Sequence, residues 1–379
     1  MSKKDVLKGD FNDKLWLKSY PAGVRWDTQF KGRPMGDLFD EAVEKYADRT
    51  FINFLGKKYS FAETGKIVDR LAAGMRADGM SLGSKVGIAL PNTPYYVFAY
   101  FAAQKLGATV VNLNPLYSEQ DMTALCKDAM IDMLFTLDAK KTYPTIANIR
   151  ENADIKKIVV CSLADALPKS KKYLLKTFNP LARMTRKLGG PSLSVEKLYP
   201  VKFDKQTVRF SQMLGNAKNL QTPTIHPDHD IAVYQYTGGT TGLPKAAMLT
   251  HSNLSINVKQ LQSWFTTMQP GNEKILAVLP FFHVFAMTAE MNLALDNGFE
   301  LVMMPEPDIK GMMKLIEKEK VTIFEGVPKL YQEVIRMSKE GKYDLSSLRT
   351  CISGGAALDP TLKQEFEELF NCTIVEGYG

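Results

Sequence analysis

Short apolar runs rich in β-branched residues recur along most of this chain, and stretches with helical periodicity separate them. Apolar runs of this length are typical of strands that are buried on both faces. We predict such strands at 85–90, 108–113, 133–137, 158–161, 275–279, 300–304, 321–324, 349–353 and 373–375. Helices are predicted at 95–106, 309–319, 329–337 and 360–370. This alternation indicates an α/β fold with parallel sheets covered by helices, in which ligands bind in the loops after the carboxyl ends of strands.

The charge of the chain is concentrated in one segment. The 48 basic and 41 acidic side chains give a net charge of +7, and residues 169–187 carry seven basic residues and no acid. The remaining residues therefore sum to zero, which argues against a nucleic-acid-binding face. Leu174, Leu175 and Phe178 lie among these cations, so 169–187 is interpreted either as an interfacial membrane contact or as a solvated insertion loop. The apolar residues favour the membrane contact.

The cysteines and the chain start bear on the compartment. Cys126, Cys161, Cys351 and Cys372 form no CxxC pair, so we predict a reducing compartment without a disulfide framework or a zinc site. The first residues lack the apolar stretch of a signal peptide, and the longest apolar run, 275–289, is too short for a transmembrane helix. We expect a cytoplasmic protein that is at most peripheral at the inner face of the membrane.

One loop combines the groups that bind polyphosphate. It reads Tyr236-Thr-Gly-Gly-Thr-Thr-Gly-Leu-Pro-Lys245. Its glycines let successive backbone N–H groups converge, while its threonine hydroxyls and its lysine add donors and a positive charge. The chain has neither a Walker A loop nor a GxGxxG fingerprint. A plain surface turn is the alternative, but such turns rarely combine so many hydroxyl groups with a lysine.

Four segments in this order resemble the core motifs of the adenylate-forming (AMP-binding) enzymes. They are 236–245, Leu279-Pro-Phe-Phe-His-Val-Phe-Ala286, Ser353-Gly-Gly-Ala-Ala-Leu358 and Glu376-Gly-Tyr-Gly379. The variant of the first segment, together with 16–21 (WLKSYP) and 112–117 (NLNPLY), is most similar to bacterial long-chain fatty-acid–CoA ligases. Ala246 departs from the family, which usually has glycine there.

The resemblance implies a fold of two packed, mostly parallel sheets, as in the large N-terminal domain of these enzymes. We expect an N-terminal α/β subdomain at 1–230, with the basic insertion at about 168–200. We expect a nucleotide-binding subdomain at 231–379. Family members continue beyond the Gly-Tyr-Gly of the last motif into a small C-terminal domain, so the chain resembles a truncated ligase of low or no activity.

The resemblance also implies a reaction in two steps. A fatty carboxylate attacks the α-phosphorus of ATP, and the thiol of CoA then displaces AMP, with Mg²⁺ bridging the phosphates and Thr237 as its candidate ligand. The implied catalytic residues are Thr240, Lys245 and His283. The implied nucleotide-binding residues are Tyr236, Thr237, Gly238, Gly239, Thr240, Thr241, Gly242, Lys245, Gly354, Gly355, Ala356, Glu376, Gly377, Tyr378 and Gly379.

Several alternatives stay open at this stage. His283 lies beside two phenylalanines, so it is either a site residue or a packed core histidine. The HxxxD pattern at 226–230 is interpreted as a turn rather than an acyltransferase motif. The acid could be an aryl or shorter acid, or the chain could be a binding module without catalysis. The candidate acyl-pocket residues, which would equally suit a core, are Val284, Phe285, Met287, Val327 and Pro328.

Overall fold

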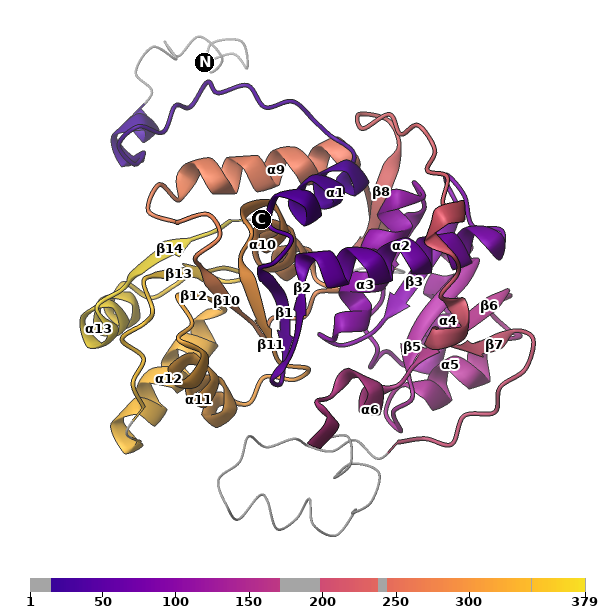
Figure 1. Ribbon diagram of the computed structural model, residues 1–379. Helices are drawn as coiled ribbons and strands as arrows, with labels where there is room; N and C mark the ends of the chain where they lie inside the picture. The colour runs from indigo at the N-terminus through magenta and orange to yellow at the C-terminus, as the bar shows by residue number, and fades with distance from the viewer. Residues whose placement is uncertain (1–14, 171–197, 238–243, 342, 379) are drawn as a thin grey trace, which may run out of the picture.

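A computed structural model describes residues 15–170, 198–237, 244–341 and 343–378 of this chain. Two seven-stranded sheets form its frame (Figure 1). Sheet A has the order β14 (Thr373–Glu376), β13 (Thr350–Ser353), β12 (Ile323–Gly326), β10 (Lys274–Ala277), β11 (Glu300–Met303), β1 (Thr50–Phe54), β2 (Lys57–Ser60). Sheet B has the order β7 (Thr207–Arg209), β6 (Lys157–Cys161), β5 (Met133–Leu137), β3 (Lys85–Ala89), β4 (Thr109–Asn112), β8 (Ile231–Thr237), β9 (Lys245–Thr250).

The α/β prediction with two mostly parallel sheets is confirmed. The predicted strands match the observed ones to within about two residues at each end. Two antiparallel hairpins, β1–β2 and β8–β9, and the short strand β7 were not predicted, and each lies at an edge of its sheet. Both sheets take strands from both sides of residue 230, so the proposed boundary there separates no whole sheet. The subdomain boundary itself stays a prediction.

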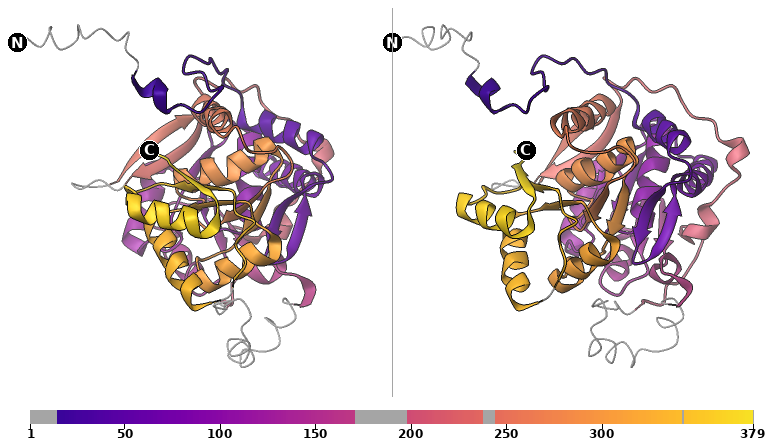
Figure 2. Two further views of the ribbon diagram at one scale, coloured as in Figure 1. Left: turned by 90° about the vertical axis from the view of Figure 1, so that its left-hand side faces the viewer. Right: turned by 60° about the vertical axis from the view of Figure 1, so that its left-hand side comes forward.

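Helices fill the space between the sheets and cover their outer faces (Figures 1 and 2). The largest apolar cluster joins the facing sides of both sheets. The elements between the sheets are α1 (Met35–Lys45), α2 (Phe61–Ala77), α3 (Pro94–Lys105), α9 (His251–Trp264), the π-helical segment η5 (Ala286–Asn292) and α10 (Leu293–Asn297). The outer helices are α4 (Glu119–Ala129) and α5 (Tyr143–Ile149) on sheet B, with α11 (Ile309–Glu319), α12 (Pro328–Glu340) and α13 (Pro360–Phe370) on sheet A. The shorter helices are η2 (Leu15–Ser19), α6 (Leu163–Ala166), η3 (Phe210–Met213) and η4 (Ala217–Asn219).

The central helix α3 shows why these elements form as they do. Its sequence is apolar on every side, which is typical of a fully buried helix. Pro94 occupies its first turn, where the missing N–H group costs nothing. The one cation, Lys105, is buried, and its Nζ atom lies 2.6 Å from Asp40 and 2.5 Å from Asp69 on the neighbouring helices. The pairing compensates for removing this charge from water.

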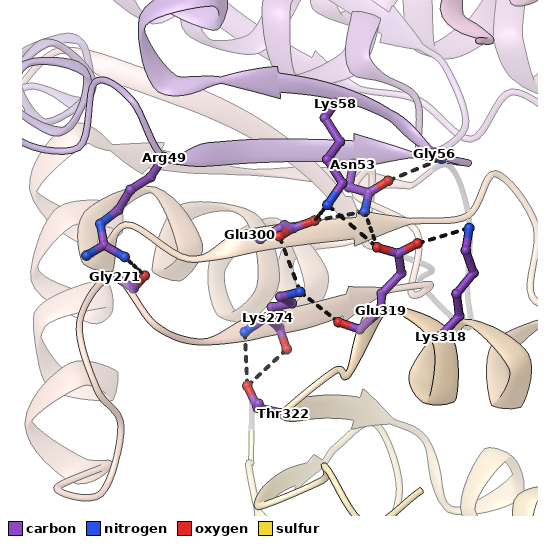
Figure 3. Close-up of polar contacts among 10 residues, drawn as sticks. All are labelled: Arg49, Asn53, Gly56, Lys58, Gly271, Lys274, Glu300, Lys318, Glu319 and Thr322. Carbon is purple, nitrogen blue, oxygen red and sulfur yellow. Dashed lines mark hydrogen bonds and ion pairs between the residues drawn. The ribbon is translucent and has the colours of Figure 1, made fainter. Parts of the chain in front are cut away.

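A polar network ties the β1–β2 hairpin to the rest of sheet A (Figure 3). The Nδ2 atom of buried Asn53 donates to Glu300 at 2.8 Å and to Glu319 at 2.9 Å. Lys58 lies 3.2 Å from Glu300, and Lys274 donates to the carbonyl oxygen of Glu319 at 2.7 Å. These charged groups join β1, β2, β10, β11 and α11 at one place in sheet A.

Two further sequence predictions concern segments outside the helices and strands. Residues 171–197, most of the basic insertion and of the predicted membrane contact, lie outside the described residues. Within the described parts of the chain, no helix has the length and apolar character needed to cross a membrane. The 226–230 segment forms the predicted turn, in which the backbone N–H of His226 donates to Asp230 at 2.7 Å.

Candidate functional site

The two ends of the predicted phosphate loop are joined by the β8–β9 hairpin. Thr237 is the last residue of β8 and pairs with Lys245, the first residue of β9. The Thr237 hydroxyl donates to the carbonyl oxygen of Lys245 at 3.3 Å. Both side chains are exposed, so the ammonium group of Lys245 is accessible to an anionic ligand. The residues between them, Gly238, Gly239, Thr240, Thr241 and Gly242, lie outside the described residues.

Tyr236 faces away from the exposed side of this hairpin. Its ring is buried in the apolar cluster beneath α4, and its hydroxyl donates to Asp128 at 2.5 Å. Burial raises the pKa of Tyr236, and the hydrogen bond to Asp128 raises it further. The side chain therefore anchors β8 to α4, and its contribution to a nucleotide site is to hold the start of the loop in place.

His283 lies in a turn that follows β10. Its backbone N–H donates to the Pro280 carbonyl oxygen at 2.9 Å, and its Nδ1 atom accepts a hydrogen bond from the Phe285 N–H at 3.3 Å. Because Nδ1 is an acceptor, the proton of the neutral ring belongs on Nε2. Desolvation of the part of the ring that faces the protein lowers the pKa of His283, which favours this neutral form. The side chain is exposed and not packed in the core, so it can donate from Nε2 to a bound ligand.

A buried asparagine holds the backbone of the His283 turn. Asn92, which follows β3, donates from Nδ2 to the Leu279 carbonyl oxygen at 2.7 Å and accepts from the Phe281 N–H at 2.9 Å. It comes from sheet B, whereas the turn belongs to sheet A. Sequence reasoning missed Asn92, because its partners Leu279 and Phe281 are distant in the sequence.

Three more buried polar side chains continue this contact between the sheets. The Tyr96 hydroxyl lies 2.6 Å from Asn112 Oδ1 and 2.8 Å from the Phe281 carbonyl oxygen. Asn112 donates to Gln235 Oε1 at 3.0 Å, and Gln235 Nε2 donates to the Phe282 carbonyl oxygen at 3.2 Å. Gln235 lies two residues before Thr237, so this chain of hydrogen bonds connects the β8–β9 hairpin to the His283 turn. Sequence reasoning did not single out these three side chains for this role.

The third motif follows β13 and packs against the second. Gly354 is buried, and a Cβ atom on it would lie 2.9 Å from Cε1 of the Phe285 ring. Gly355 has a φ of +79°, a backbone conformation that favours glycine. Gly355 and Ala356 are exposed. The loop therefore brings open backbone close to the segment that carries His283.

The fourth motif is bonded to the third. The Gly377 N–H donates to the Ser353 carbonyl oxygen at 2.8 Å, and Glu376 accepts from the Leu358 N–H at 3.1 Å. Tyr378 is fully exposed, and Gly379 lies outside the described residues. An exposed tyrosine ring beside an open glycine loop can stack on a flat ligand. Direct contacts thus connect the second, third and fourth motifs, and Gln235, the residue before the first motif, links that motif to the second.

A pocket of 410 Å³ lies next to these motifs, between β9, α9 and η5. Leu249, Leu254 and Val284 contribute apolar surface to its lining, and α9 contributes three exposed amide side chains, Asn253, Asn257 and Gln260. Its lining residues are Leu249, Ser252, Asn253, Leu254, Ile256, Asn257, Gln260, Val284 and Thr288. Of the apolar residues that the sequence suggested, Val284 lines it, and Met287 is buried in the core. Val284 directly follows His283 in the sequence, but the His283 side chain is not among the residues that line the pocket.

The described residues contain no cluster of three or more His, Cys, Asp or Glu side chains that could hold a metal ion. Mg²⁺ in phosphate sites is held largely by the phosphates and by water, with one or two protein oxygens. The hydroxyl of Thr237 fits such a role, because it donates its proton to Lys245 and keeps its lone pairs free.

Comparison with known proteins identifies the family. The model of the AMP-binding enzyme family matches residues 39–379, and the chain belongs to this family. It is 34% identical over 372 residues to a long-chain-fatty-acid–CoA ligase of Bacillus subtilis, covering 97% of this chain and 63% of that protein. A Haemophilus influenzae protein of the same description is 29% identical over 377 residues, with 97% and 64% covered. The chain thus spans less than two thirds of the length of these relatives.

Solved structures share the fold. A long-chain-fatty-acid-CoA ligase from Archaeoglobus fulgidus superposes with a TM-score of 0.76 at 22% identity, covering 95% of this chain and 66% of that one. The N-terminal domain of FACL13 from Mycobacterium tuberculosis superposes with a TM-score of 0.69 at 19% identity, covering 92% and 76%. The predicted architecture, that of the large N-terminal domain of adenylate-forming enzymes, is therefore confirmed.

Proposed function

We propose that this chain carries the nucleotide and acyl sites of an ATP-dependent long-chain fatty-acid–CoA ligase. The reaction converts fatty acid, ATP and CoA to acyl-CoA, AMP and diphosphate. The observation that carries this proposal is the match of the family model to residues 39–379, and a pocket lined in part by Val284, which belongs to the second motif, supports it. Ligases described as acting on long-chain fatty acids match this chain over 97% of its length, which supports the same substrate class here.

The chain's own groups suit the first step, the attack of the carboxylate on ATP. A fatty carboxylate is already ionised at neutral pH, so this step requires no general base. It requires alignment of the acid and stabilisation of the negative charge that moves onto the departing diphosphate. Lys245 at the start of β9 would bind the phosphates, with Thr240 and the loop glycines as further proposed donors. Nε2 of His283 would donate to the oxygen of the acyl group.

The remaining groups have supporting roles. Tyr378 and the 354–356 loop would bind the adenine ring, and Glu376 would hold that loop through Leu358. Bound Mg²⁺ would neutralise phosphate charge, with Thr237 as its protein ligand. CoA is the proposed acceptor of the second step.

The test is ATP–pyrophosphate exchange with and without palmitate. It compares this chain with the same protein extended to the natural stop codon of its gene. Exchange that depends on palmitate in the extended protein, and that falls at least about a hundredfold in Lys245→Ala, would support the proposal. Lys339→Ala is the matched control, because Lys339 lies on the outer helix α12 and its ion pair with Glu365 is exposed on both sides.

Absence of exchange with palmitate in both proteins would contradict the long-chain assignment. Exchange with 4-coumarate would then favour an aryl acid, in line with a 4-coumarate–CoA ligase of Humulus lupulus that is 28% identical over 357 residues, covering 91% of this chain and 57% of that protein. ATP binding without exchange on any acid would favour the non-catalytic binding module.

A further inference from the structure

Two cysteines far apart in the sequence meet at the far edge of sheet A. Cys351 lies in β13, and Cys372 immediately precedes β14, the neighbouring strand. Their Sγ atoms are 3.9 Å apart, which is van der Waals contact, and both are free thiols. The sequence shows no CxxC pattern here, because parallel pairing of β13 and β14 across the helix α13 creates the contact.

The two thiols differ in exposure and in the direction of their pKa shifts. Cys351 is fully buried, and its S–H group donates to Cys372 Sγ. This hydrogen bond lowers the pKa of Cys372, against the opposing effects of burial and of the Glu367 carboxylate, whereas burial raises the pKa of Cys351. Cys372 is also partly exposed. It is therefore the thiol that a small oxidant reaches, and Cys351 is the thiol next to it.

We propose that Cys351 and Cys372 form a reversible intrachain disulfide when the protein meets hydrogen peroxide. The Cys372 thiolate attacks one peroxide oxygen, the O–O bond breaks, and hydroxide leaves, giving a sulfenic acid at Cys372. The sulfur of Cys351 then attacks the sulfenic sulfur, the S–O bond breaks, and the oxygen leaves as water with the proton of Cys351. In total two thiols and one peroxide give one disulfide and two waters.

The position of Cys372 lets the sulfurs approach. A disulfide bond is about 2.05 Å long, so the pair must move closer from its separation of 3.9 Å. Cys351 is held in mid-sheet between β12 and β14. Cys372 lies outside β14, in the turn where Asn371 ends α13 with a φ of +50°. The motion therefore falls on Cys372 and on the start of β14.

This motion leads directly to the nucleotide loops. β14 ends at Glu376, which binds the Leu358 N–H, and Gly377 binds the Ser353 carbonyl oxygen two residues after Cys351. If the first residues of β13 and β14 move closer together, the relative position of the two loops that follow these strands also changes. We therefore expect slower adenylation in the oxidised protein. This expectation rests on the proposed function, whereas formation of the disulfide does not depend on it.

Peptide mapping of the complete protein after treatment with hydrogen peroxide tests the chemistry. We expect a cross-linked peptide pair containing Cys351 and Cys372, lost on reduction with dithiothreitol. Cys126 and Cys161 are internal controls, because both are buried and burial raises the pKa of each thiol. Oxidation at the pair should be at least about tenfold faster than at these controls. A rate equal to theirs, or a reduced pair after treatment, would overturn the proposal.

Single variants separate the two roles. Cys351→Ser should leave a sulfenic acid at Cys372 that dimedone traps, and Cys372→Ser should leave Cys351 unreacted. Trapped sulfenic acid at Cys351 in the second variant would contradict the assigned order. Pyrophosphate exchange measured on the same samples should fall on oxidation and recover on reduction. Unchanged exchange in a cross-linked sample would refute the link to the loops, and no exchange in the reduced sample would refute the proposed function alone.

Discussion

A single buried histidine, His251, makes folding sensitive to acid. It begins α9, and its Nδ1 atom accepts a hydrogen bond from the Met35 N–H at 3.1 Å. Its Nε2 atom is buried and has no partner among the described residues. Burial lowers the pKa of His251 to about 4, against a smaller opposing effect of Asp230. The folded protein therefore holds this ring neutral.

Stability should fall as the pH drops from 6.5 toward 4, because the unfolded chain then binds a proton at His251 that the folded chain does not. The full effect is about 3 kcal/mol in the free energy of unfolding. His251→Asn keeps an acceptor for Met35 and removes the titration. Urea unfolding of both proteins across this pH range should show a shallower profile for the variant, and parallel profiles would contradict the assignment.

Gly354 is a second residue at which one side-chain atom matters. The variant Gly354→Ala places a Cβ atom 2.9 Å from Phe285 Cε1, so the ring or the loop must move. Overpacking of this kind costs about 1–3 kcal/mol. We expect weaker ATP binding, measured by calorimetry, and recovery of part of the loss in Gly354→Ala combined with Phe285→Leu. Equal ATP binding by Gly354→Ala and the parent protein would show that the loop accommodates the added methyl group and would contradict this prediction.

At the scale of elements, the β1–β2 hairpin depends on the polar network of Asn53 (Figure 3). Asn53 is 1% exposed and donates to two carboxylates, Glu300 and Glu319. Asn53→Asp keeps the shape, removes the donors and adds a third acid. The loss in free energy of unfolding should be about 3 kcal/mol or more.

Lys58→Gln serves as the comparison for this prediction. It removes a cation that is 48% exposed, and Lys274 and Lys318 still pair with the Glu300 and Glu319 carboxylates in its absence, so we expect a smaller loss. Chemical denaturation should therefore rank Asn53→Asp well below Lys58→Gln in stability. A similar loss in both variants would mean that the network acts through its total charge and not through the hydrogen bonds of Asn53.

At the scale of the whole molecule, two carboxyl groups are enclosed where η5 packs against sheet A. Glu290 on η5 and Glu325 on β12 are both fully buried, and Glu290 accepts from the Leu279 N–H at 3.3 Å. Both oxygens of Glu325 have no partner among the described residues. Burial raises the pKa of each carboxyl group well above its usual value, and for Glu290 the neighbouring Glu325 raises it further.

The folded protein therefore retains protons here that the unfolded chain loses above about pH 4.5. Each retained proton lowers the free energy of unfolding by about 1.4 kcal/mol for every pH unit above that value, until the folded group ionises. Glu325→Gln removes one titrating group at constant shape. Urea unfolding between pH 6 and 8 should show a smaller loss of stability in the variant, and identical slopes would disprove a neutral Glu325.

The fold was largely predictable because its signals are local. Strands buried on both faces require continuous apolar runs, and α3 requires an apolar surface on every side. The outer strands of the two hairpins escaped prediction because their pattern is weak: neither β9 nor β2 has a buried residue. Neither carries the apolar run by which the predicted strands were recognised, whereas β1 and β8 contain buried apolar residues and were overlooked.

The candidate site also contains residues that the sequence could predict and residues that it could not. Glycine, threonine and lysine in the 236–245 loop indicate phosphate binding by their own chemistry, wherever the loop lies in space. The roles of Asn92 and Gln235 could not be predicted from the sequence. Their hydrogen-bond partners lie 189 and 47 residues away, and only the packing of the sheets brings them together. Tyr236 belongs to the motif, yet its hydroxyl binds Asp128, a partner that the sequence does not reveal.

By itself, the amino-acid sequence determined the α/β class, the order of the parallel strands along the chain and the residue types of a phosphate site. Each of these follows from local periodicity or from the chemistry of neighbouring side chains. The tertiary structure decided which distant groups meet: the hydrogen bonds from sheet B to the His283 turn, the enclosed carboxyl pair and the contact of Cys351 with Cys372. Contacts across sheets and helices depend on how whole elements pack, and no local pattern records that packing.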